Sequence, residues 1–505
     1  MEMVAYQPEL SPALPVVVGN FDYRQYRSTL ERIDELLRGT GTEKAFTKYY
    51  LAEAENRGRK NAADAGFVYR IPSPKVVARL EENSALALRC NIIRTLESTS
   101  YRTMSQRLAD SPLLQWFCGI NRLDVIKVPS KSSIERYDKS VPESVLRDVV
   151  NQLTLAAVDV NDQGLSIIGL ETPLSLATLL LDTTCVKANI HFPVDWVLLR
   201  DAARTLLKAI VLIRKHGLKN RMASPTDFIK SVNRLCIEMT HTRRRKDGPK
   251  HRKRVLRLLK KLARRIERHA RKHRDLLENG WEQTDIGEGE ARQIIARIDN
   301  ILTQLPAAIK QAHERIIGGR RVANKDKTLS LYEPDINVIV RGKSGSEVEF
   351  GNTFLLAEQH DGVIVDWSLL KGNKSDSKLL KGSLARFVQA FSRMPDAVVG
   401  DRGFDSPENR KAGHPETYNA ICPKSPAAMS ERMKELRFCE LQNRRSQSEG
   451  RIGIFKNNFL GLPFRSKGFD SRERDITWSV LTHNLWVIAR LPQAEENRNR
   501  HTRAA

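Results

Sequence analysis

The sequence predicts an α/β protein in which a mixed sheet is interrupted by a basic helical insertion and preceded by an all-α N-terminal domain. Apolar residues recur at helical spacing through the first third of the chain. Short apolar runs that are typical of buried strands occupy two separated regions, and a long basic stretch with helical spacing lies between them. With 505 residues, the chain exceeds the roughly 250 to 300 at which one core stops growing, so we expect several domains.

Residues 1–160 are predicted to form the helical N-terminal domain. Tyr26, Leu30, Ile33 and Leu37 follow one another at steps of four, three and four, which places them on one helix face. No strand pattern competes strongly in this region. The stretch 99–119 combines arginines with an apolar spacing, which fits either a small DNA-binding helical module or a plain helical support.

The remaining elements are assigned in chain order. Residues 176–186 read as a buried strand with a carboxylate, Asp182, near its end, and 396–401 read as a second one that ends in Asp401. Between them we expect strands at 336–341, 349–358 and 363–369 and a helix at 382–392, and after them helices from 427 to 491. The predicted domains after the first are 170–199 together with 326–491, an insertion at 200–325, and a flexible tail at 492–505.

Composition narrows the class of protein. Hydrophobic residues make up 40% of the chain, which excludes a wholly disordered protein. Lys and Arg outnumber Asp and Glu by 84 to 60, so nucleic acid is the leading partner, against a merely soluble basic protein. The six cysteines form no Cys-x-x-Cys pair, which disfavours a zinc ribbon and fits a reducing cytosol. No run approaches about 18 apolar residues, so we expect no membrane association.

Positive charge is concentrated between His241 and Arg274, where 17 Lys and Arg stand against two acids. A solvated helix face normally mixes charges of both signs, so we favour binding to phosphate backbones over simple solvation. Contacts of this kind bind DNA without reading its sequence. The candidate DNA-binding residues are Arg252, Lys253, Arg257, Lys260, Arg264 and Arg268.

The carboxylates suggest a metal-dependent reaction. Two strands that end in Asp182 and Asp401, with a third acid on a later helix, would bring hard oxygen ligands to one sheet end, as a two-metal phosphoryl-transfer site requires. Glu449 is the candidate third acid. On a helix, Arg445 and Lys456 share its face and would supply phosphate-binding cations. Taken singly, each acid also fits a helix cap or a solvated charge.

These segments together resemble the catalytic half of bacterial insertion-sequence DDE transposases. The resemblance runs from about residue 176 to 491, outside the middle of the insertion, and is carried by the order of these blocks: Leu181-Asp-Thr-Thr184, Asn189 to Asp195, Arg341-Gly-Lys343, Glu349-Phe-Gly351, Gly400-Asp-Arg-Gly-Phe404, Arg445-x-x-x-Glu449 with Lys456, and His483-Asn-Leu485. The family's tyrosine three residues before the arginine is Gln442 here, and 219 positions separate the first two acids.

The resemblance implies an RNase H-like catalytic domain with Asp182, Asp401 and Glu449 as a metal-binding triad for two Mg²⁺ or Mn²⁺ ions. It further implies a homo-oligomer acting on double-stranded DNA, at element ends and target, in the nucleoid of the bacterial cytoplasm. We therefore expect a transposase that cuts DNA at the element ends and joins them to target DNA. A non-catalytic DNA-binding protein derived from such an enzyme, or a metal-dependent nuclease without joining activity, are the alternatives.

Overall fold

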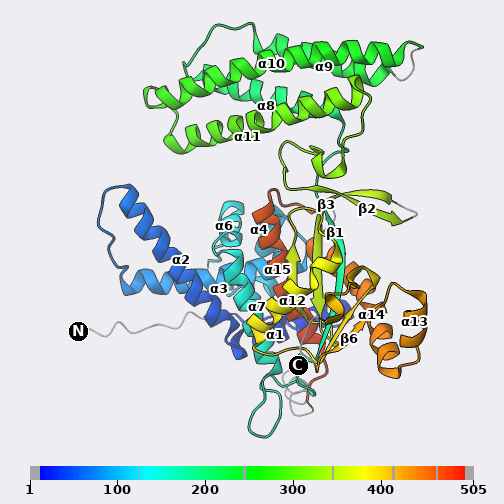
Figure 1. Ribbon diagram of the computed structural model, residues 1–505. Coiled ribbons are helices and arrows are strands. Elements are labelled where there is room, and N and C mark those ends of the chain that lie inside the picture. The colour runs from blue at the N-terminus through cyan, green and yellow to red at the C-terminus, as the bar shows by residue number, and fades with distance from the viewer. Residues whose placement is uncertain are drawn as a thin grey trace, which may run out of the picture.

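The computed structural model describes residues 12–123, 125–242, 246–343, 346–411, 416–461 and 464–494. Over these residues the chain has a mixed α/β fold, mostly helical, with one six-stranded mixed sheet. Helices α8 to α11 stand apart at one end of the molecule, and the sheet lies below them beside the N-terminal helices (Figure 1). The N-terminal helices are α1 (Phe21–Gly39), α2 (Thr42–Asp64), α3 (Pro74–Leu96), α4 (Tyr101–Asp110), α5 (Pro112–Phe117), α6 (Lys131–Asp138) and α7 (Glu143–Val158).

The first strand, β1 (Thr178–Lys187), lies near the middle of the sheet. It pairs antiparallel with β3 (Ser346–Glu358) on one side and parallel with β5 (Ala397–Gly400) on the other. The other strands are β2 (Asn337–Lys343) and β4 (Ile364–Leu369), both antiparallel to β3, and β6 (Tyr418–Ile421), parallel to β5. The predicted strands are all present with small shifts at their ends, but the sequence analysis missed β6. Only four residues long, β6 is too short to show a periodicity.

Helices α12 (Leu380–Phe391), α13 (Pro426–Arg432), α14 (Leu436–Ile454) and α15 (Phe469–Arg490) accompany the second half of the sheet. The α15 helix packs against α1, α3 and α7, and its Asn484 side chain bonds both the amide and the carbonyl of Ile364 in β4. One hydrophobic cluster therefore runs from the N-terminal helices into the sheet. The predicted N-terminal domain shares its core with the sheet within the part of the chain that is described.

The stretch 99–119 forms two short helices, α4 and α5, that meet at Ser111. Four of the six residues of α5 are buried. A helix that reads DNA must present an exposed face to the groove. The burial of α5 fits a helical support, but α4 buries only Met104 and Leu108, so both interpretations of the stretch stay open.

Helices α8 (Asp195–Lys215), α9 (Pro225–His241), α10 (Gly248–Gly280) and α11 (Glu288–Ala312) form the insertion and have a hydrophobic cluster of their own. Val255, Leu259 and Ile266 of α10 lie on one face and are fully buried, whereas Leu258 is 50% exposed. A separate core stabilises this group of helices independently of the sheet. No helix in the described ranges has both the length and the apolar character needed to span a bilayer.

Residues 492–494, which the sequence assigns to the flexible tail, make backbone contacts. Gln493 forms an isolated β-bridge with Leu170, and the Glu171 amide donates to the Pro492 carbonyl. Residues 495–505 of the predicted tail lie outside the described residues.

We predict that Glu333→Gln destabilises the protein by about 3 to 5 kcal/mol, because it leaves Arg472 as a buried charge without its counter-ion. Glu333 (4% exposed) binds the Arg472 guanidinium (1% exposed) and accepts the Gly468 amide at 3.0 Å. Denaturant unfolding measures the loss. The matched control is Glu55→Gln, which breaks the exposed Glu55–Arg59 pair and should cost less than about 1 kcal/mol. Equal losses in the two variants would contradict the prediction.

Candidate functional site

The first two candidate acids lie at the same level on neighbouring parallel strands. Leu180 of β1 is paired with Val399 of β5, so Asp401, directly after the end of β5, lies level with Asp182. The prediction that the first strand ends in Asp182 is wrong: Asp182 is the fifth of the ten residues of β1, and the strand continues to Lys187 because it stays paired with β3. Neighbouring strands are about 4.8 Å apart. Asp401 follows the last residue of β5 and accepts the Gly403 amide at 2.9 Å, while Asp182 accepts the Thr183 amide at 2.7 Å. The structure brings the two predicted acids together.

Helix α14 delivers the third acid to the same strands, because side chains of this helix fix it against the sheet. Gln442 donates to the carbonyls of Gly400 in β5 and Ala420 in β6. Six residues later, Ser448 donates to the buried Glu358 carboxylate at the end of β3. The residue that departs from the family pattern thus ties α14 to the strand ends next to Asp401.

The charges of Asp401, Glu449 and Arg445 all act on the pKa of Asp182. The pKa of Asp182 is raised from 3.8 to about 6, first by burial and then by the charges of Asp401 and Glu449. The Thr183 amide and the positive charge of Arg445 lower it. Arg445 donates to Gln442 Oε1 at 3.0 Å on its own helix. Asp182 therefore lies within electrostatic reach of both other acids and of the arginine.

Glu449 lies exposed at the outer edge of this group, and its carboxylate makes no hydrogen bond or ion pair with any described residue. Among the described residues, no three His, Cys, Asp or Glu side chains are clustered closely enough to form a ready-made metal group. The donor set nevertheless fits a hard divalent cation, since these are carboxylates whose mutual repulsion a cation would relieve. Asp182 and Asp401 form the inner pair, with Glu449 beside them.

A further carboxylate, Asp376, is next to Asp401 and was not predicted. A Cβ added to Gly403 would lie 2.7 Å from Asp376 Oδ2 and 3.0 Å from Asp401 Oδ1. The two carboxylates are therefore close neighbours, and only a glycine fits between them without displacing one. Asp376 lies in a short helical turn between β4 and α12, away from any strand end, and no sequence pattern marks it.

We predict that divalent-ion binding weakens as the pH falls through about 6. The raised pKa leaves Asp182 mostly protonated at pH 5 and ionised above pH 7, and only the ionised form is a good ligand. The association constant for Mn²⁺, measured by calorimetry, should fall by up to about tenfold per pH unit below pH 6 and level off above pH 7. In Asp182→Asn this dependence should disappear. A constant that is flat from about pH 5 to 8 in the parent protein would contradict the prediction.

Lys456 lies beyond the end of α14, in a π-helical turn at Phe455–Leu460. Its Nζ donates to Thr184 Oγ1 at 3.1 Å. Thr184 is two residues after Asp182 on β1, and residues two apart on a strand share a face. Lys456 therefore approaches the strand that bears Asp182, as expected for a cation placed near a reacting phosphate.

We predict that Arg445→Ala and Lys456→Ala have separable effects. Lys456→Ala should weaken binding to the element end and slow joining about tenfold, with nearly parental metal affinity, because its amine bonds the Thr184 hydroxyl of β1 and the lysine is not one of the predicted metal ligands. Arg445→Ala should weaken metal binding too, since loss of its charge raises the pKa of Asp182 further. Calorimetry with Mn²⁺ separates the two. If Lys456→Ala cuts and joins as fast as the parent at raised salt, Lys456 has only a structural role.

The basic residues of α10 fall into two classes. Arg252 donates to Thr242 and packs over the Trp196 ring, and the Lys260 amine bonds His313 at 2.9 Å. Burial lowers the pKa of Lys260. These two predicted DNA contacts are engaged within the insertion.

The other class makes no hydrogen bond or ion pair in the described part of the chain. It comprises Lys250, Lys253, Arg257, Lys261, Arg264, Arg268 and Lys272, which we call the α10 stripe. At 100° per residue these residues lie within an arc of about 100° opposite the buried face, and at 1.5 Å per residue they extend over about 33 Å. Four of the six predicted DNA-binding residues, Lys253, Arg257, Arg264 and Arg268, therefore belong to the α10 stripe, together with Lys250, Lys261 and Lys272. Their spacing of three and four could have been read from the sequence.

Comparison with models of known protein families, with curated proteins and with solved structures returned no match for this chain. The site is therefore described by its own geometry. Asp182 in β1 lies level with Asp401 and within reach of the charges of Glu449 and Arg445, and Lys456 bonds Thr184 of β1. A row of cations without partners among the described residues lies on the insertion.

Proposed function

We propose that this protein is a metal-dependent DDE transposase that cuts DNA at the ends of an insertion sequence and joins them to target DNA. The observation that carries the proposal is the interaction of Asp182 with Asp401, Glu449 and Arg445, because these four residues come from three separate elements and match the family's order. A mixed sheet with β1 near its middle and acids on or directly after two neighbouring parallel strands is consistent with an RNase H-like catalytic domain.

Asp182 and Asp401 present carboxylate oxygens from the sheet, and Glu449 adds a third from α14. Bound Mg²⁺ or Mn²⁺ would neutralise charge on the scissile phosphate and help to activate the attacking hydroxyl. Arg445 holds positive charge beside the carboxylates and keeps Asp182 more readily ionised. Lys456, held near β1 by Thr184, is placed to bind a phosphate next to the one that reacts.

The α10 stripe supplies the affinity for duplex DNA in this proposal. Its length of about 33 Å is close to one helical turn of B-DNA, so successive cations can contact phosphates along one side of the duplex. These contacts place the DNA and carry no sequence information. Sequence recognition of the element ends is left to other parts of the protein or complex, which we propose to be a homo-oligomer on DNA in the bacterial nucleoid.

The test is a cleavage and joining assay with the purified full-length chain. A labelled duplex that carries the ends flanking the gene is incubated with a supercoiled target plasmid, with Mg²⁺, with Mn²⁺ or with a chelator. Metal-dependent cutting at the end followed by labelled plasmid supports the transposase. Cutting without labelled plasmid supports the nuclease, and binding without cutting supports the non-catalytic DNA-binding protein.

A further inference from the structure

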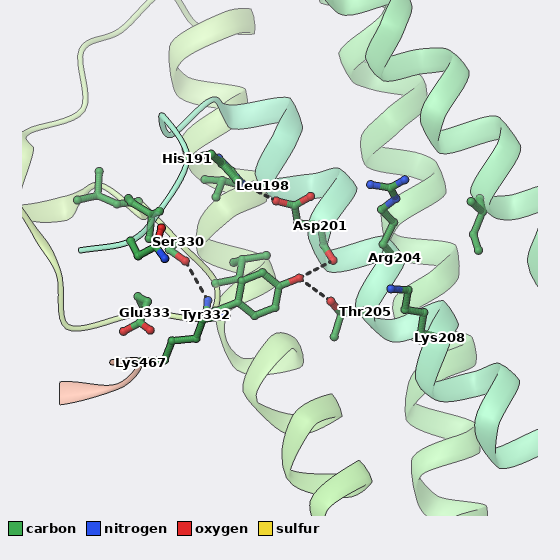
Figure 2. Close-up of a pocket in the computed structure, with 15 residues that line it drawn as sticks. His191, Leu198, Asp201, Arg204, Thr205, Lys208, Ser330, Tyr332, Glu333 and Lys467 are labelled. Atoms are coloured by element: carbon green, nitrogen blue, oxygen red, sulfur yellow. Dashed lines mark hydrogen bonds and ion pairs between the residues drawn. The ribbon is translucent and has the colours of Figure 1, made fainter. Parts of the chain in front are cut away.

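A pocket of about 510 Å³ lies where the insertion meets the sheet, away from the carboxylates. It is lined by the segment after β1, by α8, by the segment 329–333 and by Lys467 (Figure 2). From Asp182 to the end of β1 at Lys187 the strand alone spans about 16 Å, so a molecule in this pocket is not the reacting phosphate. The volume is in the range of pockets that hold small organic ligands.

The acids that line the pocket have partners of their own. Asp201 is bound by His191 Nε2 at 2.8 Å and by Arg200 at 3.4 Å. Glu333 is held by Arg472 and by the Gly468 amide. Neither carboxylate therefore needs a cation from the pocket.

Three cations in the lining have no such partners. Arg204, Lys208 and Lys467 are exposed and make no hydrogen bond or ion pair with the residues that the structure describes. Arg204 and Lys208 are one turn apart on α8, so their side chains emerge as neighbours. Because the acids are neutralised and these cations are not, the pocket attracts an anion.

The pocket also presents an aromatic ring that is fixed in position. The Tyr332 hydroxyl is 2.6 Å from Thr205 Oγ1 and donates to the Asp201 carbonyl at 3.3 Å, while its amide donates to Ser330 Oγ at 3.1 Å. The side chain is nevertheless 49% exposed. In Figure 2 the ring points across the pocket toward α8, with Thr205 at its hydroxyl and Arg204 and Lys208 beyond. A planar group can lie on this ring without further rearrangement.

We propose that this pocket binds a nucleotide, with its phosphate at Arg204 and Lys208 and its base against the Tyr332 ring. Arginine and lysine bind phosphate groups, and aromatic rings stack on bases of any sequence. The nucleotide has two possible sources: an unpaired residue of a DNA strand or a free nucleotide. The inference of a DNA strand rests on the proposed function, and that of a free nucleotide does not. The two sources share this chemistry and differ in what is attached to the phosphate.

The experiment measures binding to the full-length chain without any cleavage step. Calorimetry with dAMP and with inorganic phosphate tests the free nucleotide, and fluorescence anisotropy of a labelled oligo(dT) strand tests the strand. Arg204→Gln with Lys208→Gln should weaken binding of the true ligand about tenfold or more, and Tyr332→Ala about tenfold. Tyr332→Phe keeps the ring and should stay within about threefold of the parent. The matched control, Lys230→Gln with Arg234→Gln, removes two exposed cations of α9 that do not line the pocket.

Weaker dAMP binding in the pocket variants supports the proposal with a free nucleotide as the ligand. Weaker binding of the oligo(dT) strand alone supports it with an unpaired residue of a DNA strand as the ligand. If Arg204→Gln with Lys208→Gln weakens binding of inorganic phosphate while Tyr332→Ala binds all probes like the parent, the pocket is a simple anion site. This result would overturn the nucleotide proposal. Equal losses in the pocket variant and the α9 control, or no binding of any probe, would overturn it as well. The Asp182→Asn variant should bind dAMP and the strand like the parent, so a failure of the catalytic proposal leaves this result unaffected.

Discussion

Replacement of Asp182 or Asp401 by asparagine is expected to reduce strand cleavage by about 10³-fold or more while duplex binding stays at the parental level. Each substitution removes a hard charged ligand from the pair that faces across β1 and β5. The α10 stripe supplies duplex affinity in our proposal. It lies on a group of helices with a separate hydrophobic core, so neither substitution changes it. Single-turnover cleavage of a labelled end duplex, together with a binding titration, measures both effects.

Asp182→Asn should lose cleavage but gain stability. A gain in the free energy of unfolding would show that the loss of cleavage does not come from unfolding. The folded pKa of about 6 is above the ordinary 3.8, so stabilisation by protonation is complete below about pH 4 and is lost as the pH rises through 6. At pH 7 the ionised, buried carboxylate is therefore a cost. Its neutral replacement should stabilise the protein by about 1 to 3 kcal/mol in denaturant unfolding.

The third acid is tested by Glu449→Gln, which should lose cleavage as the other two variants do. Parental cleavage by this variant would remove Glu449 from the site and make Asp376, the carboxylate beside Asp401, the next candidate. Parental cleavage by Asp182→Asn or Asp401→Asn would instead refute the assignment of these acids as the catalytic site, because other residues would then carry the cleavage.

Removal of positive charge from the α10 stripe is expected to have the second largest effect. Arg257, Lys261, Arg264 and Arg268 lie on this stripe and have no partners among the described residues. Changing all four to glutamine should reduce the slope of log affinity against log salt by about three to four on B-DNA, since each phosphate contact contributes about 0.9. Binding to duplexes of any sequence should weaken equally.

The matched control removes four exposed cations from the other helices of the insertion: Lys215, Lys230, Arg234 and Arg297. Both variants lose the same net charge, so a general electrostatic effect would reduce both slopes alike. A distinct loss in the stripe variant assigns the DNA to that face of α10. A slope that is unchanged in the stripe variant would show that α10 carries a solvated helix face only.

Local sequence patterns determined much of this protein. The apolar runs before Asp182 and Asp401 predicted the strands β1 and β5, and the helical spacing of α10 predicted its amphipathic character. These features depend on the alternation of residues within one element, which a linear sequence displays directly. The choice of Glu449 as the third acid came from the Arg445-x-x-x-Glu449 block and stays a prediction.

Only the tertiary structure decided which residues meet. The register between β1 and β5 sets Asp182 level with Asp401, and a glycine brings Asp376 beside them. Contacts between α10 and its neighbours engage Arg252 and Lys260. The α10 stripe has no partners among the described residues, and composition alone does not distinguish these two groups of cations. These outcomes depend on strand register and on packing between segments far apart in the chain, and a periodicity within one segment carries no information about either.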